Sequence, residues 1–264
     1  MPRLKLTIEY DGTRYVGWQV QPNGTSIQAR LVRALEELLG EQVAVEAAGR
    51  TDAGVHATGQ VVCFNTPRTL PLKAYWMGLN GLLPEDIAVV RAEEVPAEFD
   101  PRRWSHGKRY RYRVSNKPTR SPLRRFTHWE VFAPLQVEAM QRAAAHLVGR
   151  HDFSAFRASN CQATHALREV RRVDVQGTSR DEVSFTVEGT AFLKHMVRNL
   201  VGTLVEVGKG RRPEAWVAEV LASRDRKRAG PTAPPQGLVM EEVFYGDGPP
   251  PRTPGGTADE EGEE

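Results

Sequence analysis

The chain has 264 residues, of which 40% are hydrophobic and 26% are charged, as is usual for a globular protein. No apolar run approaches the ~20 residues that cross a membrane. Strand-like alternation begins at Leu4, which leaves no room for a signal peptide, so we expect a cytoplasmic protein. The only cysteines are Cys63 and Cys161, and the seven histidines are scattered, which argues against a disulfide framework and a metal site.

The formal net charge of +3 understates how basic most of the chain is. The last 19 residues, 246–264, hold six acidic residues and one arginine, so their charge of −5 leaves +8 for the rest. Only seven of the 36 basic residues are lysines. Arginine suits bidentate phosphate contacts and stacking on bases, although a basic surface also serves solubility. The Pro-, Gly- and acid-rich residues from 246 onward predict a disordered tail.

The first part of the chain reads as a mixture of strands and helices. Thr25 and Gln28 fit a capping box before a helical pattern that Gly40 ends. Around it, short apolar alternations predict strands and a Pro-led segment predicts a second helix. The predicted strands are 4–10, 43–47, 61–64 and 87–91, and the predicted helices are 27–38 and 71–80.

The stretch from Gly49 to Gln60 carries three glycines between two of these strands. Glycine lets a backbone turn tightly or approach a ligand closely, so we expect a turn at the edge of a sheet. This turn presents Arg50, Asp52 and His56 with little apolar cover. A carboxylate in such a place can cap the turn, bind a metal or take part in chemistry, and capping is the commonest of these roles.

Residues 102–114 form the most basic run and alternate with aromatics. In a strand, Lys108, Tyr110 and Tyr112 share one face, and Arg109, Arg111 and Arg113 share the other. Bases stack on aromatic rings and phosphates pair with guanidinium groups, so this run suits looped or single-stranded RNA. A charged edge strand that resists aggregation has the same composition.

A Pro-containing segment, 116–125, reads as a linker before a second set of elements. Strands are predicted at 127–132, 169–175, 182–188 and 237–244, and helices at 134–149, 194–207 and 213–220. His195, Arg198, Asn199 and Gly202 fall on one face of the helix 194–207. We therefore predict an α+β protein with mainly antiparallel sheets. It has an N-terminal half (1–115), the linker, a C-terminal half (126–245) and the acidic tail (246–264).

Several ordered motifs together resemble the TruA family of tRNA pseudouridine synthases, and the likeness extends from about Leu4 to Phe244. The motifs that carry it are Tyr10–Thr13 with Gly17–Gln19, Gly49–Ala57, Lys108–Tyr112, Asp152–Arg157, Phe192 with His195–Gly202, and Gly237-Leu238. The acidic tail after Tyr245 has no counterpart in the family pattern.

The resemblance implies a pseudouridine synthase fold, with the two halves side by side around a central active-site cleft. It implies isomerisation of uridine to pseudouridine at positions 38, 39 and 40 of the tRNA anticodon stem-loop. It also implies a homodimer with tRNA bound across both subunits, no cofactor and no metal. The reaction brings in no electrons or groups, in keeping with the absence of metal-ligand spacings. Neither a membrane nor a small-molecule partner is expected.

By position in these motifs, Asp52 corresponds to the catalytic aspartate, Tyr110 to the tyrosine packed on the target base, and Arg198 to the ion-pair partner of the aspartate. Arg50 would contact the flipped nucleotide or its backbone, and Leu238 would help to wall the base pocket. We expect further RNA contacts from Lys108, Arg109, Arg111 and Arg157. Two other hypotheses are a non-catalytic tRNA-binding protein or RNA chaperone, and, more weakly, a metal-dependent RNA-modifying enzyme.

Overall fold

The computed structural model describes residues 1–250, and these fall into two compact units. Unit 1 consists of Met1–His106 and the segment that begins at Met240, whereas unit 2 is Gly107–Val239. The chain leaves unit 1 inside strand β5 (Ser105–Ser115) and returns to it inside β10 (Leu238–Tyr245). This division differs from the predicted one, since residues 116–125 lie within unit 2. Of the predicted tail, only 246–250 are among the described residues.

Unit 1 is built on an antiparallel sheet. Strand β1 (Arg3–Tyr10) pairs with β3 (His56–Asn65) on one side and with β4 (Ile87–Val95) on the other. The short β2 (Glu46–Ala47) also pairs with β3, and β10 lies next to β3 in the strand order. The buried side chains of Leu4, Leu6 and Ile8 confirm the predicted alternation of β1.

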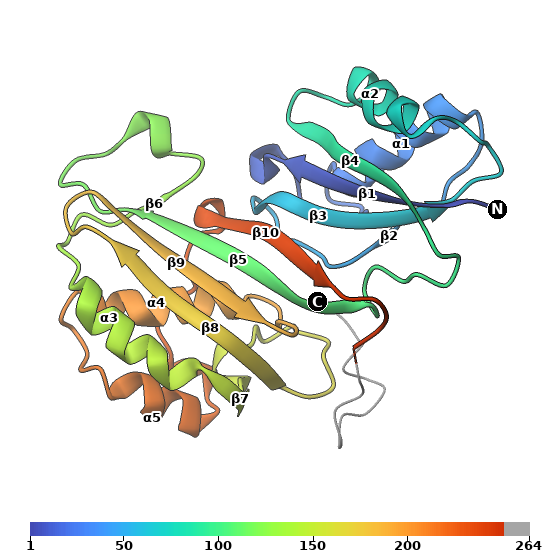
Figure 1. The fold of residues 1–264 in the computed structure, drawn as a ribbon. Helices are drawn as coiled ribbons and strands as arrows, with labels where there is room; N and C mark the ends of the chain where they lie inside the picture. The colour runs from blue at the N-terminus through green and yellow to red at the C-terminus, as the bar shows by residue number, and fades with distance from the viewer. Residues whose placement is uncertain (251–264) are drawn as a thin grey trace. The chain divides into compact units, whose positions relative to one another are not determined.

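Two helices complete unit 1 (Figure 1). Helix α1 (Ile27–Leu39) packs on α2 (Leu72–Leu82), which packs against β4. Gly40 ends α1 with φ +68°, as predicted, because glycine adopts this left-handed conformation without penalty. The predicted cap at Thr25 is wrong by one position: Ser26 Oγ accepts the Ala29 N–H at 3.2 Å.

The sheet of unit 2 has the strand order β5, β9, β8, β7. Strands β8 (Leu167–Gly177) and β9 (Glu182–Gly189) form the predicted hairpin, and β9 pairs antiparallel with β5. Strand β7 (Gly149–Asp152), which the sequence did not predict, adds to β8 at the edge. The two-residue β6 (Trp129–Glu130) pairs in parallel with β5.

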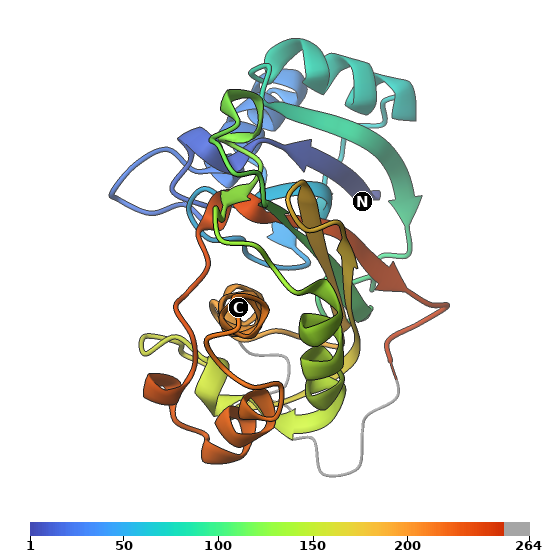
Figure 2. The same cartoon turned by 90° about the vertical axis from the view of Figure 1, so that its left-hand side faces the viewer.

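Three helices lie on one side of this second sheet (Figure 2). Helix α3 (Val137–Ala144) packs against β8, α4 (Met196–Gly208) and α5 (Trp216–Ser223). Helix α4 is the centre of the core, with Leu200, Val201 and Leu204 fully buried. The two units thus confirm the predicted α+β class with mainly antiparallel sheets. Within residues 1–250, no helix is long and apolar enough to cross a membrane.

Candidate active site

The loop that carries Asp52, residues 48–55, runs from β2 to β3 and is bonded to the loop that follows β1. The Trp18 N–H donates to the Thr51 carbonyl at 3.0 Å, just before Asp52. The Gly54 N–H donates to the Tyr15 carbonyl at 3.3 Å, just after it. The backbone is therefore held on both sides of Asp52 by the segment 11–18.

Two glycines of that segment permit this close approach. Gly17 has φ +108°, and a Cβ there would lie only 2.6 Å from the Thr51 carbonyl oxygen. A Cβ on Gly12 would overlap the Val55 carbonyl. Any larger residue at either position would push the two loops apart, so their packing depends on glycine.

Buried polar side chains attach the Asp52 loop to the sheet of unit 1. The hydroxyls of Tyr10 and Thr51 lie 2.8 Å apart, and Gln60 Nε2 donates to the Gly49 carbonyl at 2.8 Å. Burial raises the pKa of Tyr10, against the opposing effect of its hydrogen bonds, so its hydroxyl stays protonated. Within this firmly held loop, Asp52 is partly exposed and Arg50 is exposed.

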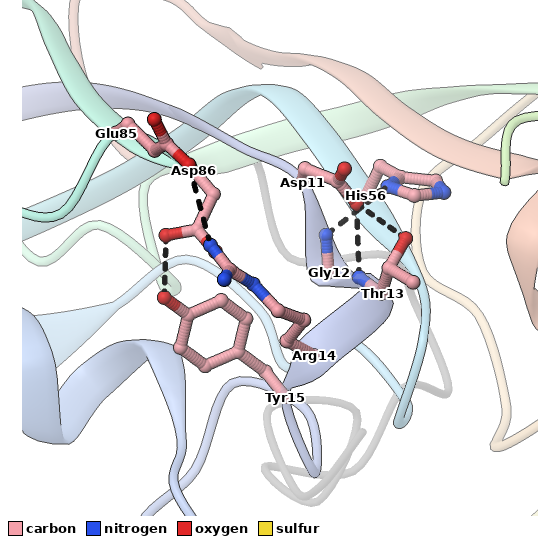
Figure 3. Close-up of polar contacts among 8 residues, drawn as sticks. All are labelled: Asp11, Gly12, Thr13, Arg14, Tyr15, His56, Glu85 and Asp86. Carbon is pink, nitrogen blue, oxygen red and sulfur yellow. Dashed lines mark hydrogen bonds and ion pairs between the residues drawn. The ribbon is translucent and has the colours of Figure 1, made fainter.

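His56 differs from the prediction, because this first residue of β3 has a buried side chain. Its ring lies beside Asp11, Gly12 and Thr13 (Figure 3). Its Nδ1 lies 3.1 Å from the Gly12 backbone nitrogen and 3.0 Å from Asp11 Oδ1. Burial tends to raise the pKa of Asp11, but hydrogen bonds from Thr13 and the nearby imidazole outweigh it and lower that pKa. His56 therefore helps to hold residues 11–13 in place through its contacts with Asp11 and Gly12.

In unit 2, β5 has the two predicted faces. The side chains of Lys108, Tyr110 and Tyr112 are buried, whereas those of Arg109, Arg111 and Arg113 are partly exposed. Tyr110 lies opposite Val187 of β9 and meets the Phe192 ring edge-on, with ring centroids 5.1 Å apart and planes at 83°. This aromatic contact fixes the plane of the Tyr110 ring.

Arg198 lies in the first turn of α4 and is bonded to the segment that leads into β10. Its Nε donates to the Ala233 carbonyl at 2.8 Å. The next residue of the segment, Pro234, accepts the Tyr112 hydroxyl at 2.7 Å, and the buried Leu238 follows at the start of β10. Burial raises the pKa of Tyr112 while the Arg198 charge opposes this, which reflects how near the two side chains are. Residues 233–238 thus connect α4 with the tyrosine face of β5.

The predicted RNA-binding side chains have varied surroundings. Arg109 Nε donates to Glu188 Oε1 at 2.7 Å on the neighbouring strand, and Arg157 Nη1 donates to the Ala163 carbonyl at 3.3 Å. Lys108 is 5% exposed. Arg50 and Asp52 belong to unit 1 and all the other predicted site residues to unit 2, so their convergence in one cleft stays a prediction.

Sequence reasoning missed a polar network that binds residues 226–233 to α4. The fully buried Asn199 donates from Nδ2 to the Phe156 carbonyl at 2.7 Å. Its Oδ1 accepts from Thr232 Oγ1 at 2.7 Å and from Arg226 Nη2 at 3.1 Å. The motif placed Asn199 on one helix face with Arg198, but Phe156 lies 43 residues earlier in the chain and Arg226 and Thr232 lie 27 and 33 residues later, so no local pattern reveals these partners.

The backbone of His195 was also not foreseen. This residue precedes α4 with φ +62°, a left-handed conformation that costs a non-glycine residue on the order of 1 kcal/mol. Its carbonyl accepts the Asn199 N–H at 2.9 Å, so the strained residue begins the helix that carries Arg198. Among residues 1–250, no three His, Cys, Asp or Glu side chains gather so as to hold a metal ion.

Comparison with known proteins identifies the family of the chain. The family model described as tRNA pseudouridine synthase matches residues 6–102 and 143–246, which include the Asp52 loop and α4. The chain belongs to this family. Members of the family are isomerases that convert uridine to pseudouridine in tRNA.

Relatives in the family match along all or most of the chain. The tRNA pseudouridine synthase A of Myxococcus xanthus is 77% identical over 264 residues, covering 100% of both chains. That of Geotalea uraniireducens is 51% identical over 245 residues, covering 93% of this chain and 100% of the relative. Among solved structures, a chain of a Cbf5–Nop10–Gar1 complex aligns with a TM-score of 0.36 at 12% identity, covering 76% of this chain and 45% of the other.

Proposed function

We propose that the chain isomerises uridine to pseudouridine at positions 38, 39 and 40 of the tRNA anticodon stem-loop, with Asp52 as its catalytic carboxylate. The observation that carries this proposal is the Asp52 loop, which is fixed on both sides by backbone hydrogen bonds to residues 11–18. Such a loop keeps a reactive carboxylate in one position while leaving its side chain partly exposed.

The reaction breaks the bond between ribose C1′ and uracil N1, turns the base, and joins C1′ to C5. The proton on C5 is lost and N1 gains one, so the product is an isomer and no electrons are exchanged. A carboxylate at Asp52 serves this chemistry by adding covalently to ribose C1′ or uracil C6, or by removing a ribose proton. All three routes need the same residue, in ionised form, next to the target nucleotide.

The residues of unit 2 and Arg50 supply the other roles in this proposal. Tyr110 presents its ring to the target base, Arg198 pairs with the Asp52 carboxylate, and Leu238 walls the base pocket. Arg50 contacts the nucleotide. The basic side chains of Lys108, Arg109, Arg111 and Arg157 contact phosphates, which offsets the few kcal/mol that flipping a base costs.

We further propose that a cytoplasmic homodimer binds the tRNA across both subunits. Light scattering of the purified protein, alone and with tRNA, tests this part. A monomer in both samples would contradict it.

The decisive experiment is a chemical map of pseudouridine in tRNA incubated with the purified protein or with Asp52→Asn. We expect product at positions 38–40 with the wild type and a loss of at least about a thousandfold in rate with Asp52→Asn. Asp174→Asn is a matched control, because Asp174 pairs with Arg172 on β8 of unit 2. Full turnover by Asp52→Asn would refute the role of Asp52. Tight tRNA binding with no product from the wild type would instead favour a non-catalytic tRNA-binding protein.

A further inference from the structure

Asp86, just before β4, is bonded through both carboxylate oxygens to the segment that holds the Asp52 loop (Figure 3). Its Oδ1 accepts the Tyr15 hydroxyl at 2.6 Å. Its Oδ2 accepts Arg14 Nε at 3.0 Å and Arg14 Nη2 at 2.7 Å. The Asp86 side chain is only 10% exposed, whereas that of Arg14 is 66% exposed, so the carboxylate is buried and the guanidinium covers it from the solvent side.

The backbone of Asp86 strengthens the same connection. Its carbonyl accepts the Asp11 N–H at 2.9 Å, so the segment 11–15 is attached to Asp86 near both ends. Burial, together with the neighbouring Asp86 carboxylate, raises the pKa of Tyr15. The Tyr15 phenol therefore remains a hydrogen-bond donor throughout the pH range in which a tRNA-modifying enzyme is assayed.

The segment passes this restraint to Asp52. Tyr15, whose hydroxyl is bound by Asp86, uses its own carbonyl to accept the Gly54 N–H. Gly17, two residues further on, forms an isolated β-bridge with Asp52 itself. A continuous path of hydrogen bonds and close packing thus runs from the Asp86 carboxylate to the backbone on each side of Asp52.

We propose that Asp86 is a positioning residue for the catalytic Asp52, acting through Tyr15 and Arg14. This inference rests on the proposed role of Asp52. Asp86 touches no reacting atom in this scheme. It sets the position and orientation of the loop that carries the Asp52 carboxylate. Moving that carboxylate by about 1 Å can lower the rate a hundredfold.

The hydrogen-bond pattern makes Asp86→Asn a sharp test. If its oxygen accepts from Tyr15 as in the wild type, an asparagine presents Nδ2 to the Arg14 guanidinium, which has donors only; the flipped amide accepts from Arg14 but reverses the bond to Tyr15, and in both orientations the negative charge is lost. Arg14→Gln supplies the missing acceptor, because the glutamine amide falls near the position of Arg14 Nε. We therefore expect Asp86→Asn to lower kcat at least about tenfold, with KM and tRNA affinity changed less than about twofold. The double variant Asp86→Asn/Arg14→Gln should recover most of the lost kcat.

Two matched variants separate positioning from general destabilisation. Glu85→Gln removes a neighbouring carboxylate that is 91% exposed. Its Oε1 lies 3.8 Å from Arg14 Nη2, which is too long for a hydrogen bond, so kcat should not change. Asp100→Ala removes the carboxylate oxygen Oδ1 that accepts the backbone N–H groups of Arg102 and Arg103 elsewhere in unit 1. Asp100→Ala should lower the melting temperature while leaving kcat unchanged.

If Asp86→Asn does not fold, Tyr15→Phe replaces it, since this variant removes only the hydroxyl donor. The proposal is overturned if the variant that folds keeps kcat within about twofold of the wild type, or if Asp100→Ala at an equal loss of melting temperature lowers kcat as much. Failure of the proposed function has a different signature: Asp52→Asn would then retain turnover, whatever Asp86 does.

Discussion

Arg198 and Ala233 are joined by two reciprocal hydrogen bonds. Arg198 Nε donates to the Ala233 carbonyl at 2.8 Å, and the Ala233 N–H donates to the Arg198 carbonyl at 3.1 Å. The first turn of α4 and the segment before β10 therefore hold each other in register. The bond from Arg198 Nε orients the guanidinium, and in the proposed function its positive charge pairs with the Asp52 carboxylate.

Arg198→Lys should keep the positive charge but lose the planar group that bonds Ala233. We expect kcat to fall about tenfold or more, with tRNA affinity within about twofold, since a lysine cannot reproduce a fixed guanidinium fork. Arg198→Ala should lose more. Single-turnover rates at saturating enzyme measure the effect, and near-normal rates for Arg198→Ala at neutral pH would remove the ion-pair role.

Gly202→Ala should destabilise the protein by about 1–3 kcal/mol, because a Cβ at this position of α4 would overlap the Pro231 carbonyl. Gly81→Ala is the matched control, since Gly81 lies in α2 and a Cβ there meets nothing within 4 Å. That change should stabilise by about 0.5–1 kcal/mol through helix propensity alone. Urea denaturation of both variants tests the contrast, and equal effects of the two would contradict it.

Tyr110→Phe should retain the edge contact with Phe192 and the stacking surface for a base, so tRNA affinity should stay within about twofold of the wild type. If the hydroxyl carries the C5 proton, kcat should fall by about a hundredfold. Tyr75→Phe in unit 1 removes a hydroxyl that donates to the Arg68 carbonyl at 3.0 Å and should leave kcat unchanged. Equal turnover by Tyr110→Phe and wild type would show that the hydroxyl moves no proton.

Asp152 gives a pH-dependent contribution to stability. Burial tends to raise its pKa, but hydrogen bonds from Ser154 and the charges of Arg224 and Arg157 outweigh this and lower it. A lowered pKa means that the stabilisation is complete above about pH 4 and is lost as the pH falls through the folded-state value. Asp152→Asn should therefore be about 0.5 kcal/mol less stable at pH 7, and this difference should shrink at pH 3. Urea titrations at both pH values measure it, and a constant difference would count against the ionised carboxylate as the cause.

The sequence predicted those features that depend on short-range patterns. Alternation along β5 placed Tyr110 and Tyr112 on the buried face, because strand geometry alone decides which side chains share a face. Gly40 marked the end of α1 for an equally local reason. The prediction for Asp52 also began with a local pattern, since three glycines within a few residues indicate a turn.

Features that depend on contacts between residues far apart in the sequence could not be predicted from short-range patterns. Asn199 bonds Arg226 and Thr232, and Asp86 bonds Tyr15 about 70 residues earlier in the chain. In the sequence alone, Asn199 and Asp86 look like ordinary polar residues, and nothing near either of them indicates its partners. The unpredicted β7 is a further example, since it exists through pairing with β8 and its four residues include no buried side chain.

Strand β10 has a consequence for how the protein is made. Its residues from Met240 onward belong to unit 1, and Gly59 of β3 lies so close to the Glu241 carbonyl that a Cβ would overlap it. During translation, residues Gly107–Val239 leave the ribosome before Met240 and the rest of this strand do. Until Met240 and the following residues are synthesised, residues 1–106 lack β10, and the edge of β3 around Gly59 is unpaired. Such an edge can pair with strands of other chains. Unit 2 can therefore complete its fold before unit 1 does, although synthesis of unit 1 begins first.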